Sequence, residues 1–265
     1  MKCVGIVVNY AKFGAAALAE EVCACLHRGG IRPVIVQDAP MAQAERCEAL
    51  IAIGGDGTIL RAARIVIPYE IPVLGINMGR LGFLAGLERH EIGMLSQLAS
   101  NRFTLEHRML LEAKVLRSEE TVCEHLCLND AVLSRYATPR MIEIPVACDG
   151  HVLVYHGDGL IFSTPTGSTA YAFSAGGPVV DPQFASILLT PICNHRLFSR
   201  PILFAPETRF AAEIAQEGAA LTCDGEPQFV LSPGQTVTVR RAEKSVRFIQ
   251  IKKQSIIDIL GEKLN

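Results

Sequence analysis

The sequence lacks both an excess of charge of one sign and a long apolar run. Its 265 residues hold 25 Lys and Arg against 27 Asp and Glu, a formal net charge of -2. Proteins that bind the nucleic-acid phosphate backbone carry a cationic excess, so we expect no nucleic-acid partner. No stretch reaches the roughly 18 uninterrupted apolar residues that a membrane-spanning helix needs, and the apolar run 3–8 is shorter than a secretory core of about 7–15 residues. These absences predict a soluble, cytoplasmic protein with no membrane partner.

The sequence also lacks the common metal and phosphate motifs. Cys23 and Cys25 are one residue apart and Cys123 and Cys127 three apart, whereas zinc sites use Cys-x2-Cys spacing. The nine cysteines are an odd number and mostly lie in apolar stretches, which predicts buried free thiols in a reducing compartment. Neither G-x-x-x-x-G-K-[ST] nor G-x-G-x-x-G occurs, so the chain is not a P-loop enzyme.

Apolar runs and helix-like stretches alternate along the first hundred residues. The hydrophobic content of 49% is enough for one large or two modest cores. The alternation predicts a Rossmann-like α/β domain with a parallel sheet over residues 1–100. Gly29 and Gly30 are expected to end the first helix. The predicted strands are Cys3–Val8, Pro33–Val36, Leu50–Ile53 and Val73–Ile76, and the predicted helical segments are Ala15–Arg28, Thr58–Ile67 and Leu81–Ser100.

The apolar period changes from 3.6 to 2 near Thr104, which predicts a β-rich domain over residues 101–252. Asp149-Gly150 supplies the two positive-φ positions of a hairpin turn. Ser255 is placed to cap an amphipathic helix within residues 253–265, which we expect to pack back on the first domain. The other predicted strands are Leu111–Leu116, Glu124–Leu133, Gly159–Ser163, Phe210–Ile214, Thr236–Arg240 and Arg247–Ile251, with turns at Asp224-Gly225 and Pro233-Gly234.

The first candidate site is Gly54-Gly55-Asp56-Gly57-Thr58, between a predicted strand and a predicted helix. Glycines at such a turn let a phosphate approach backbone N–H groups, and the helix N-terminus favours negative charge. A carboxylate beside phosphates repels them unless it binds Mg²⁺ or accepts a proton from a hydroxyl nucleophile. Both roles for Asp56 are typical of kinases, and a tight turn with Asp as a helix cap is the alternative.

The second candidate site is a hydroxyl-rich segment. Six of the twelve residues from Ser163 to Ser174 are Ser or Thr, whose hydroxyls offer donors and acceptors suited to a sugar and a nucleobase. Tyr171 is suited to stack on a base, and an Asn129-Asp130 pair is suited to an adenine edge and ribose hydroxyls. The alternative is a Ser/Thr-rich loop before a capped helix. Three basic residues near these motifs are further candidates for phosphate or dinucleotide contacts: Arg61, Arg140 and His156.

Taken together and in order, these motifs resemble the NAD kinase family, from Val4 to about Val239. The hydroxyl-rich motif is highly specific to that family, whereas the Gly-Gly-Asp-Gly-Thr element alone is not. The resemblance implies an α/β domain, a sandwich-like domain of two β-sheets, and a homodimer or homotetramer in which a neighbouring subunit completes the site. It also implies phosphorylation of the 2′-hydroxyl of the adenosine ribose of NAD to give NADP, with ATP or polyphosphate as donor and Mg²⁺. The motifs that carry it are Gly54–Thr58, Asn129-Asp130, Gly157-Asp158-Gly159 with Ser163–Tyr171, Gly176-Gly177-Pro178, Thr190-Pro191-Ile192 and Asp224-Gly225.

The resemblance implies roles for single residues. Asp56 matches the catalytic carboxylate, and Asp158 matches a carboxylate that reaches the nicotinamide end across a subunit interface. Asp130 stands where the family usually has Glu, and its shorter side chain leaves room for a bridging water to a ribose hydroxyl. Glu226 stands where Gln is frequent. The other matches to NAD-binding positions are Gly55, Gly57, Asn129, Thr169, Ala170, Tyr171 and Ser174, with Gly225 in the last motif as a further candidate.

Two other classes of protein share part of this pattern. A lipid or sugar kinase also uses a Gly-Gly-Asp-Gly element, but it does not predict the segment from Ser163 to Tyr171. A dinucleotide-binding sensor would keep the pocket without needing Asp56. For a kinase, in-line phosphoryl transfer depends mainly on positioning and charge neutralisation. Asp56 then either orients the 2′-hydroxyl or contacts Mg²⁺, and the sequence leaves both roles open.

Overall fold

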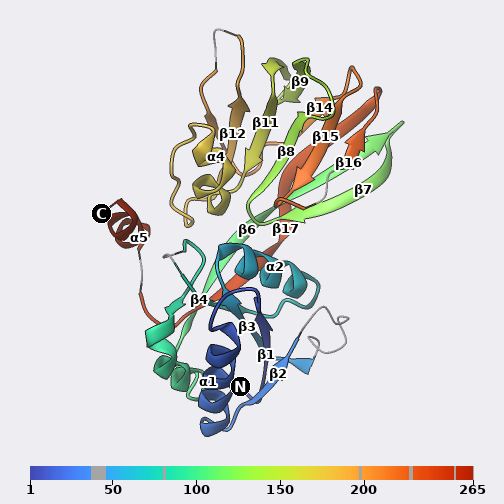
Figure 1. The fold of residues 1–265 in the computed structure, drawn as a ribbon. Coiled ribbons are helices and arrows are strands. Elements are labelled where there is room, and N and C mark those ends of the chain that lie inside the picture. The colour runs from blue at the N-terminus through green and yellow to red at the C-terminus, as the bar shows by residue number, and fades with distance from the viewer. Residues whose placement is uncertain (37–45, 80–81, 197–198, 227–228, 254, 265) are drawn as a thin grey trace. The chain divides into compact units, whose positions relative to one another are not determined.

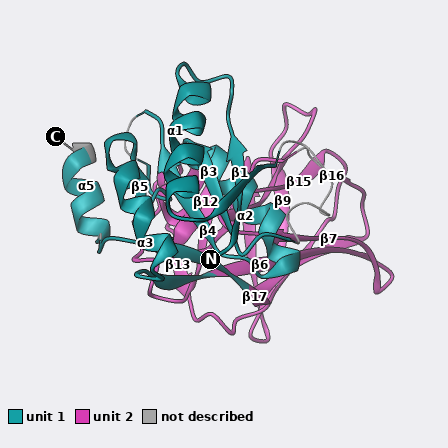
Figure 2. Ribbon diagram, turned by 90° about the horizontal axis from the view of Figure 1, so that it is seen from below, with its two compact units in different colours: residues 1–108, 245–265 teal, residues 109–244 magenta. Residues whose placement is uncertain are grey.

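The computed structural model describes residues 1–36, 46–79, 82–196, 199–226, 229–253 and 255–264, and the chain forms two compact units (Figure 1). Unit 1 comprises residues 1–108 and 245–265, and unit 2 comprises residues 109–244 (Figure 2). The change of period predicts boundaries near residues 100 and 252, whereas the units divide after 108 and after 244. Two long strands, β6 (Thr104–Arg117) and β17 (Gln235–Gln250), each continue from one unit into the other, so the period of two does not change where the units divide.

Unit 1 contains the predicted parallel sheet. Its strands follow the order β2-β1-β3-β4, and the end of β17 adds beside β4 through Phe248 and Val73. Every residue of β1, β3 and β4 is buried, as expected for central strands of a parallel sheet that is covered on both faces. The elements are β1 (Cys3–Val8), α1 (Ala15–Arg28), β2 (Arg32–Ile35), β3 (Ala49–Gly54), α2 (Asp56–Val66), the 3₁₀ turn η2 (Ile67–Tyr69) and β4 (Val73–Asn77).

The predicted helix Leu81–Ser100 is wrong for most of its length, and Leu81 itself lies outside the described residues. The structure places β5 (Leu87–Glu88), the 3₁₀ helix η3 (Arg89–Leu95) and a short α3 (Ser96–Ala99) there. Gly86 lies against the sheet, since its N–H donates to the Gly75 carbonyl at 3.0 Å and a Cβ on it would lie 3.2 Å from the Ile249 carbonyl oxygen. The apolar periodicity reflects burial of residues such as Leu95 and Leu98 in the unit 1 core and not one continuous helix.

Unit 2 is built from antiparallel strands in two sheets, as expected. One sheet has the order β13-β12-β11-β8-β15-β16. In the other, β10, β9, β14 and β17 follow one another, and β6 pairs with β7. The elements are β7 (Glu120–Cys127), β8 (Asp130–Arg135), β9 (Ile142–Cys148), β10 (His151–Gly157), β11 (Gly159–Ser163), η4 (Thr166–Thr169), α4 (Tyr171–Ser174), β12 (Ile187–Ile192), β13 (Ile202–Phe204), β14 (Phe210–Glu213), β15 (Ala219–Cys223) and β16 (Phe229–Leu231).

The two sheets of unit 2 enclose one apolar core. Its buried residues come from both sheets, including Phe162 from β11 and Phe210 from β14, whose ring centroids are 5.3 Å apart. The predicted hairpin at Asp149-Gly150 is confirmed, because both residues adopt positive φ, 48° and 77°, between the paired strands β9 and β10. Unit 2 is therefore sandwich-like, with its core between the sheets.

Two strand predictions in the β-rich region are corrected. The predicted strand Glu124–Leu133 is two strands, because the N–H groups of residues 128–130 donate to the Asp224 carboxylate and not to a neighbouring strand. The segments Thr236–Arg240 and Arg247–Ile251 belong largely to one continuous strand, β17.

The last helix, α5 (Ile256–Leu264), belongs to unit 1 and begins where the sequence predicts. The Asp258 N–H donates to the Ser255 hydroxyl and the Ser255 N–H donates to the Asp258 carboxylate, so Ser255 caps the helix. Ile259 is buried, whereas Ile257 is 70% exposed. The apolar face of α5 is thus only partly covered.

Candidate active site

The Gly-Gly-Asp-Gly-Thr element forms the expected strand-to-helix turn. Strand β3 ends at Gly54, Gly55 precedes α2 in an extended conformation, and the Gly55 carbonyl accepts the N–H of Thr58 at 2.8 Å. A Cβ on Gly54 would collide with the Thr58 side chain. The first position of this element must therefore be glycine for the helix to begin directly after the buried strand.

Asp56, the first residue of α2, has its carboxylate fixed by backbone. The Phe83 N–H donates to Oδ2 at 2.9 Å and the Leu84 N–H donates to Oδ1 at 3.2 Å. A Cβ on Gly82 would collide with the same carboxylate. A carboxylate has about four acceptor positions, so two N–H donors leave it able to accept a further proton donor or to contact a cation. The helix-cap alternative does not describe Asp56, because its carboxylate accepts from the 83–84 segment.

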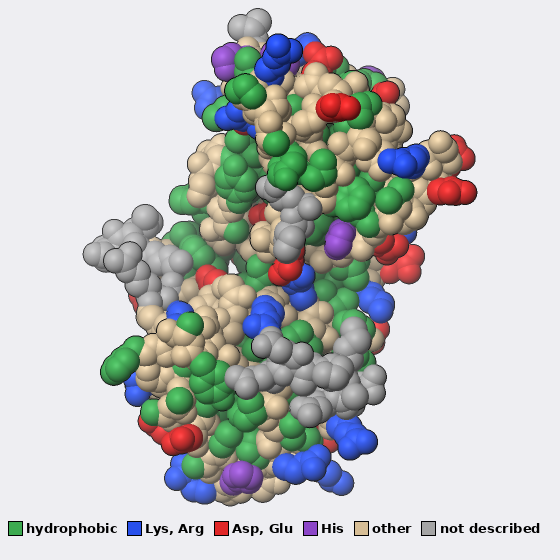
Figure 3. Space-filling model, turned by 45° about the vertical axis from the view of Figure 1, so that its right-hand side comes forward, with side chains coloured by type: hydrophobic (Ala, Val, Ile, Leu, Met, Phe, Trp, Pro, Cys, Tyr) green, Lys and Arg blue, Asp and Glu red, His purple; other side chains and the backbone are tan. Residues whose placement is uncertain are grey.

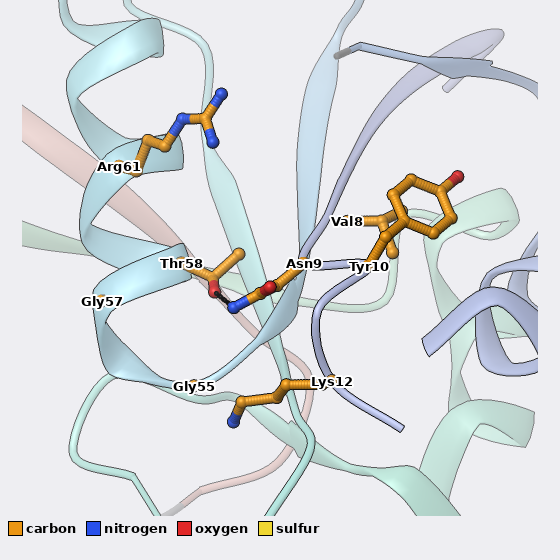
Figure 4. Close-up of a pocket in the computed structure, with 8 residues that line it drawn as sticks. All are labelled: Val8, Asn9, Tyr10, Lys12, Gly55, Gly57, Thr58 and Arg61. Atoms are coloured by element: carbon orange, nitrogen blue, oxygen red, sulfur yellow. Dashed lines mark hydrogen bonds between the residues drawn. The ribbon is translucent and has the colours of Figure 1, made fainter. Parts of the chain in front are cut away.

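A cavity of about 600 Å³ opens beside this turn within unit 1 (Figure 4). The Lys12 ammonium donates to the Met78 carbonyl at 2.7 Å, and a Cβ on Gly55 would lie 2.9 Å from Lys12 Nζ. Figure 4 shows Arg61 extending from the next turn of α2 and the Asn9 amide directed at the Thr58 hydroxyl, 3.4 Å away. Two cations and an open glycine turn suit a phosphate chain. The lining residues are Val8, Asn9, Tyr10, Lys12, Gly55, Gly57, Thr58 and Arg61.

Unit 2 brings a second group of predicted residues together. Asn129 directly precedes β8 and Asp130 is its first residue. Gly167 packs so closely on the Asn129 backbone that a Cβ on Gly167 would collide with it. Burial raises the pKa of the Tyr171 hydroxyl first, and the negative charges of Cys193, Asp158 and Asp130 raise it further. Tyr171 is 46% exposed. Its hydroxyl is therefore within electrostatic range of both carboxylates.

The two carboxylates of this group have different environments. Asp130 is 6% exposed, and burial first and then the charge of Asp224 raise its pKa to about 7. Asp158 accepts from Arg135 Nε at 2.9 Å while both side chains stay about one-third exposed. Near neutral pH, Asp130 is thus partly protonated and able to donate a hydrogen bond, whereas Asp158 forms an ion pair.

The prediction that the hydroxyl-rich segment offers its hydroxyls to a ligand is wrong for the buried ones. Ser163, Thr164 and Ser168 are fully buried and their hydroxyls bind backbone: Thr164 Oγ1 donates to the Leu128 carbonyl at 2.6 Å, and Ser168 Oγ donates to the Pro165 carbonyl at 2.7 Å. The Thr169 hydroxyl donates to the Thr166 carbonyl at 3.2 Å. These hydroxyls shape the loop, because every buried polar group needs a partner. The exposed side chains of this segment lie at its end and include Tyr171 and Ser174.

The remaining candidates lie elsewhere in unit 2 or in its turns. Arg140 is exposed, and its N–H donates to the Thr138 hydroxyl at 3.1 Å. His156 lies on β10, where its N–H donates to Asn194 Oδ1 at 2.9 Å. Gly225 has φ 72° in the turn after β15, as a left-handed position requires. Ala170 links η4 and α4. No contact joins Arg140 or His156 to Asn129 or Tyr171 among the interactions of the described residues.

The sequence analysis assigned no role to four polar residues that shape the two sites. Lys12 and Asn9 follow β1 and line the unit 1 cavity. Asp224 and Arg135 contact the predicted site residues of unit 2. An Asn-x-x-Lys run directly after the first strand was the available signal for the first pair. Asp224 lies in the Asp224-Gly225 motif, but neither Asp224 nor Arg135 gave a local signal of its contacts, because their partners are distant in sequence.

The surface carries charged side chains of both signs. Acidic and basic side chains both occur on the face drawn in Figure 3, as the near-zero net charge suggests. Within the described ranges, no helix is long and apolar enough to cross a membrane. All nine cysteines are free thiols, as predicted, and Cys193 is exposed.

The α/β unit with its Gly-Gly-Asp-Gly turn and the two-sheet β unit match the two domain models of one family of kinases. The family model described as ATP-NAD kinase N-terminal domain matches residues 34–102, and the model described as ATP-NAD kinase C-terminal domain matches residues 128–251. The chain belongs to the NAD kinase family.

Relatives and solved structures agree with this assignment. The chain is 38% identical to the NAD kinase of Natranaerobius thermophilus over 224 residues, which are 83% of this chain and 78% of that protein. It is 33% identical to the NAD kinase of Desulforamulus reducens over 280 aligned positions, covering 100% and 97% of the two chains. Yeast NADH kinase complexed with NADH superposes with a TM-score of 0.91 at 26% identity, covering 100% and 87%. An NAD kinase from Archaeoglobus fulgidus in complex with ATP gives 0.81 at 25%, covering 99% and 98%.

Proposed function

We propose that the protein transfers the terminal phosphoryl group of ATP to the 2′-hydroxyl of the adenosine ribose of NAD, giving NADP and ADP. The observation that carries the proposal is the Asp56 carboxylate, which two backbone N–H groups fix at a glycine turn beside a cationic cavity. The likeness to NAD kinases over most of the chain supports the identity of both substrates.

Unit 1 supplies the carboxylate and the phosphate-binding groups. In the transfer, the ribose oxygen forms a bond to the γ-phosphorus while the bond from that phosphorus to the bridging oxygen of ADP breaks. Asp56 orients the 2′-hydroxyl and accepts its proton, late in the step, because an ordinary aspartate is a weak base toward an alcohol. Lys12 and Arg61 neutralise charge on the donor phosphates that enter the cavity.

A divalent metal, Mg²⁺, fits this chemistry without a dedicated protein cage. In the part of the chain that the structure describes, no three His, Cys, Asp or Glu side chains gather as a metal site. Mg²⁺ commonly keeps several waters and uses one or two carboxylates together with substrate phosphates. Asp56 would hold it through its remaining acceptor positions, and the metal would neutralise charge on the donor phosphates.

Unit 2 supplies recognition of the dinucleotide. Asn129 is suited to an adenine edge, Asp130 and Asp158 to hydroxyl and amide groups, and Tyr171 to stacking, since its ring is half-exposed. We assign Thr169, Ala170 and Ser174 to the same surface because they flank Tyr171 in η4 and α4. Arg140, His156 and Gly225 stay further candidates.

The proposal extends to assembly and compartment. We propose a homodimer or homotetramer in which Asp158 serves a neighbouring subunit, supported by the partial exposure of both members of the Asp158–Arg135 pair. Nine free thiols support action in the reducing cytoplasm. Light scattering of the purified protein tests the first point, since a monomer at working concentration would contradict it.

The experiment that tests the activity is a coupled assay of NADP formation from NAD with Mg·ATP, with polyphosphate as a second donor arm. NADP from the wild-type protein and none from Asp56→Asn supports the proposal, and the donor arms show which phosphoryl source is used. NAD binding without NADP formation from either donor contradicts a kinase activity and favours a dinucleotide sensor.

A further inference from the structure

Asp224 makes an unusual set of contacts with residues that are distant in sequence. It follows β15, and its side chain is 9% exposed. Its Oδ2 accepts the Leu128 N–H at 2.8 Å, and its Oδ1 accepts the N–H groups of Asn129 at 2.7 Å and Asp130 at 3.0 Å. One carboxylate therefore receives three consecutive backbone N–H donors, from the two residues between β7 and β8 and from the first residue of β8.

The carbonyl groups of the same segment are fixed from another direction. Thr164 Oγ1 donates to the Leu128 carbonyl at 2.6 Å, and the Thr164 N–H donates to the Asn129 carbonyl at 2.9 Å. The Asp224 N–H donates to the Asp130 carbonyl at 2.9 Å. All backbone polar groups of residues 128–130 thus have protein partners, while no hydrogen bond of the Asn129 side chain is found within the described residues. The backbone is satisfied and the Asn129 amide is available to a ligand.

We propose that Asp224 is a positioning residue for the dinucleotide, whose carboxylate holds the Leu128–Asp130 backbone so that the Asn129 and Asp130 side chains face the adenosine moiety in one orientation. The inference rests on the proposed function, because it assigns Asp224 to the recognition of NAD. Asp224 acts through Asn129 and Asp130 and is not itself placed in contact with the substrate.

Only a carboxylate suits this position. Three N–H donors converge on Asp224, and an asparagine there would offer one acceptor oxygen and two competing N–H donors. The carboxylate is also retained despite an electrostatic cost, since its charge lies close enough to Asp130 to raise the pKa of that carboxyl. A position that served packing alone would not need a second buried negative charge beside Asp130.

The chain offers a matched control. Asp149-Gly150 is another Asp-Gly turn, with φ 48° and 77° against 50° and 72° for Asp224-Gly225. Asp149 is exposed, and no side-chain hydrogen bond joins its carboxylate to another described residue. Asparagine tolerates the left-handed conformation, so Asp149→Asn keeps the backbone geometry and tests a charge change at a turn without the three N–H contacts.

The experiment compares the wild type, Asp224→Asn and Asp149→Asn by steady-state kinetics with NAD and ATP varied in turn, and by calorimetric titration of NAD in the absence of ATP. We expect Asp224→Asn to raise the KM and the dissociation constant for NAD roughly tenfold or more, with kcat and the KM for ATP changed less than threefold. Asp149→Asn should match the wild type in every parameter.

The outcomes separate the inference from the proposed function. A wild type that binds NAD but forms no NADP contradicts the function and leaves the NAD titration as the test of Asp224. A loss of kcat in proportion to the loss of folded protein, with unchanged NAD affinity, overturns the positioning role. If Asp224→Asn does not fold, amide exchange of the wild type decides: slow exchange at residues 128–130 before NAD is added supports the inference, and fast exchange that slows only with NAD overturns it.

Discussion

Two aspartates, Asp56 in unit 1 and Asp224 in unit 2, are each held by consecutive backbone N–H groups, but they are held to different extents. Asp56 receives two N–H donors and is partly buried, whereas Asp224 receives three and is 9% exposed. A carboxylate has about four acceptor positions. The number of backbone donors therefore sets how many acceptor positions of the carboxylate remain for chemistry.

The difference supports the different roles proposed for the two carboxylates. Asp56 has a fixed orientation and remaining acceptor capacity, which a group that accepts a proton or contacts a metal ion needs. Asp224 has most of its capacity filled by the backbone that it holds, so it serves residues Asn129 and Asp130. Breaking each contact should therefore affect different kinetic parameters.

The largest effect is expected at Asp56. Asp56→Asn keeps the shape of the side chain but removes the proton acceptor, so kcat should fall about 10³-fold, while the dissociation constant for NAD changes less than threefold. Single-turnover kinetics and NAD titration measure the two quantities, with Asp149→Asn as the control. If NAD binding is lost together with kcat, Asp56 positions the dinucleotide and the contrast with Asp224 disappears.

A substitution of Lys12 tests whether the cavity beside Asp56 binds the phosphates of ATP. Lys12→Met retains the aliphatic stem but removes the cation near Gly55, so we expect the KM for ATP to rise about tenfold while the KM for NAD changes less than twofold. The exposed Lys244 in unit 2 provides the control, Lys244→Met. Equal changes in both KM values for Lys12→Met would show that the cavity does not distinguish donor from acceptor.

In unit 2, the raised pKa of Asp130 predicts a pH dependence of the free energy of unfolding. Its pKa is raised from 3.8 to about 7 by burial and by Asp224. Between these two values the folded state binds more protons than the unfolded state, so this group's contribution to stability falls as pH rises, and the loss is complete above about pH 7. The difference corresponds to an upper bound of about 4 kcal/mol.

As pH rises from 5 to 8, we therefore expect the unfolding free energy of Asp130→Asn to rise by about 2 kcal/mol relative to that of the wild type. Denaturant titrations of both proteins at the two pH values measure it, and using the difference between the proteins removes the contribution of other titrating groups. A constant difference from pH 5 to pH 8 would mean that Asp130 is ionised across the range.

Sequence reasoning found the elements whose signals are local. The strand Cys3–Val8, the helix Ala15–Arg28 and the Asp149-Gly150 hairpin follow from apolar period, a glycine stop and turn chemistry within a few residues. The Gly54–Thr58 turn was found for the same reason, since strand, glycines and helix are adjacent in sequence.

Tertiary contacts explain what was missed. The break between β7 and β8 depends on Asp224, almost a hundred residues later, and the Ser163–Ser168 hydroxyls bind backbone that no local pattern reveals. The segment after residue 81 has a helical apolar period because its residues are buried on one side, although the sheet and Gly86 interrupt the helix. Periodicity reports burial, and hydrogen-bond partners decide the conformation.

The smallest effect is expected at Arg61, which lines the cavity but is exposed. Arg64 lies almost one turn further along α2 and does not line the described cavity, so it provides a control on the same helix. Because the contribution of an exposed charge is screened by salt, Arg61→Gln should raise the KM for ATP about threefold at low ionic strength and have little effect near 0.5 M salt. Arg64→Gln should leave the KM for ATP unchanged at both ionic strengths. An equal, salt-independent effect of the two substitutions would indicate a change in α2 itself. Arg61 would then not belong to the phosphate-binding groups, and Lys12 would be the cation of the unit 1 cavity that contacts the donor phosphates.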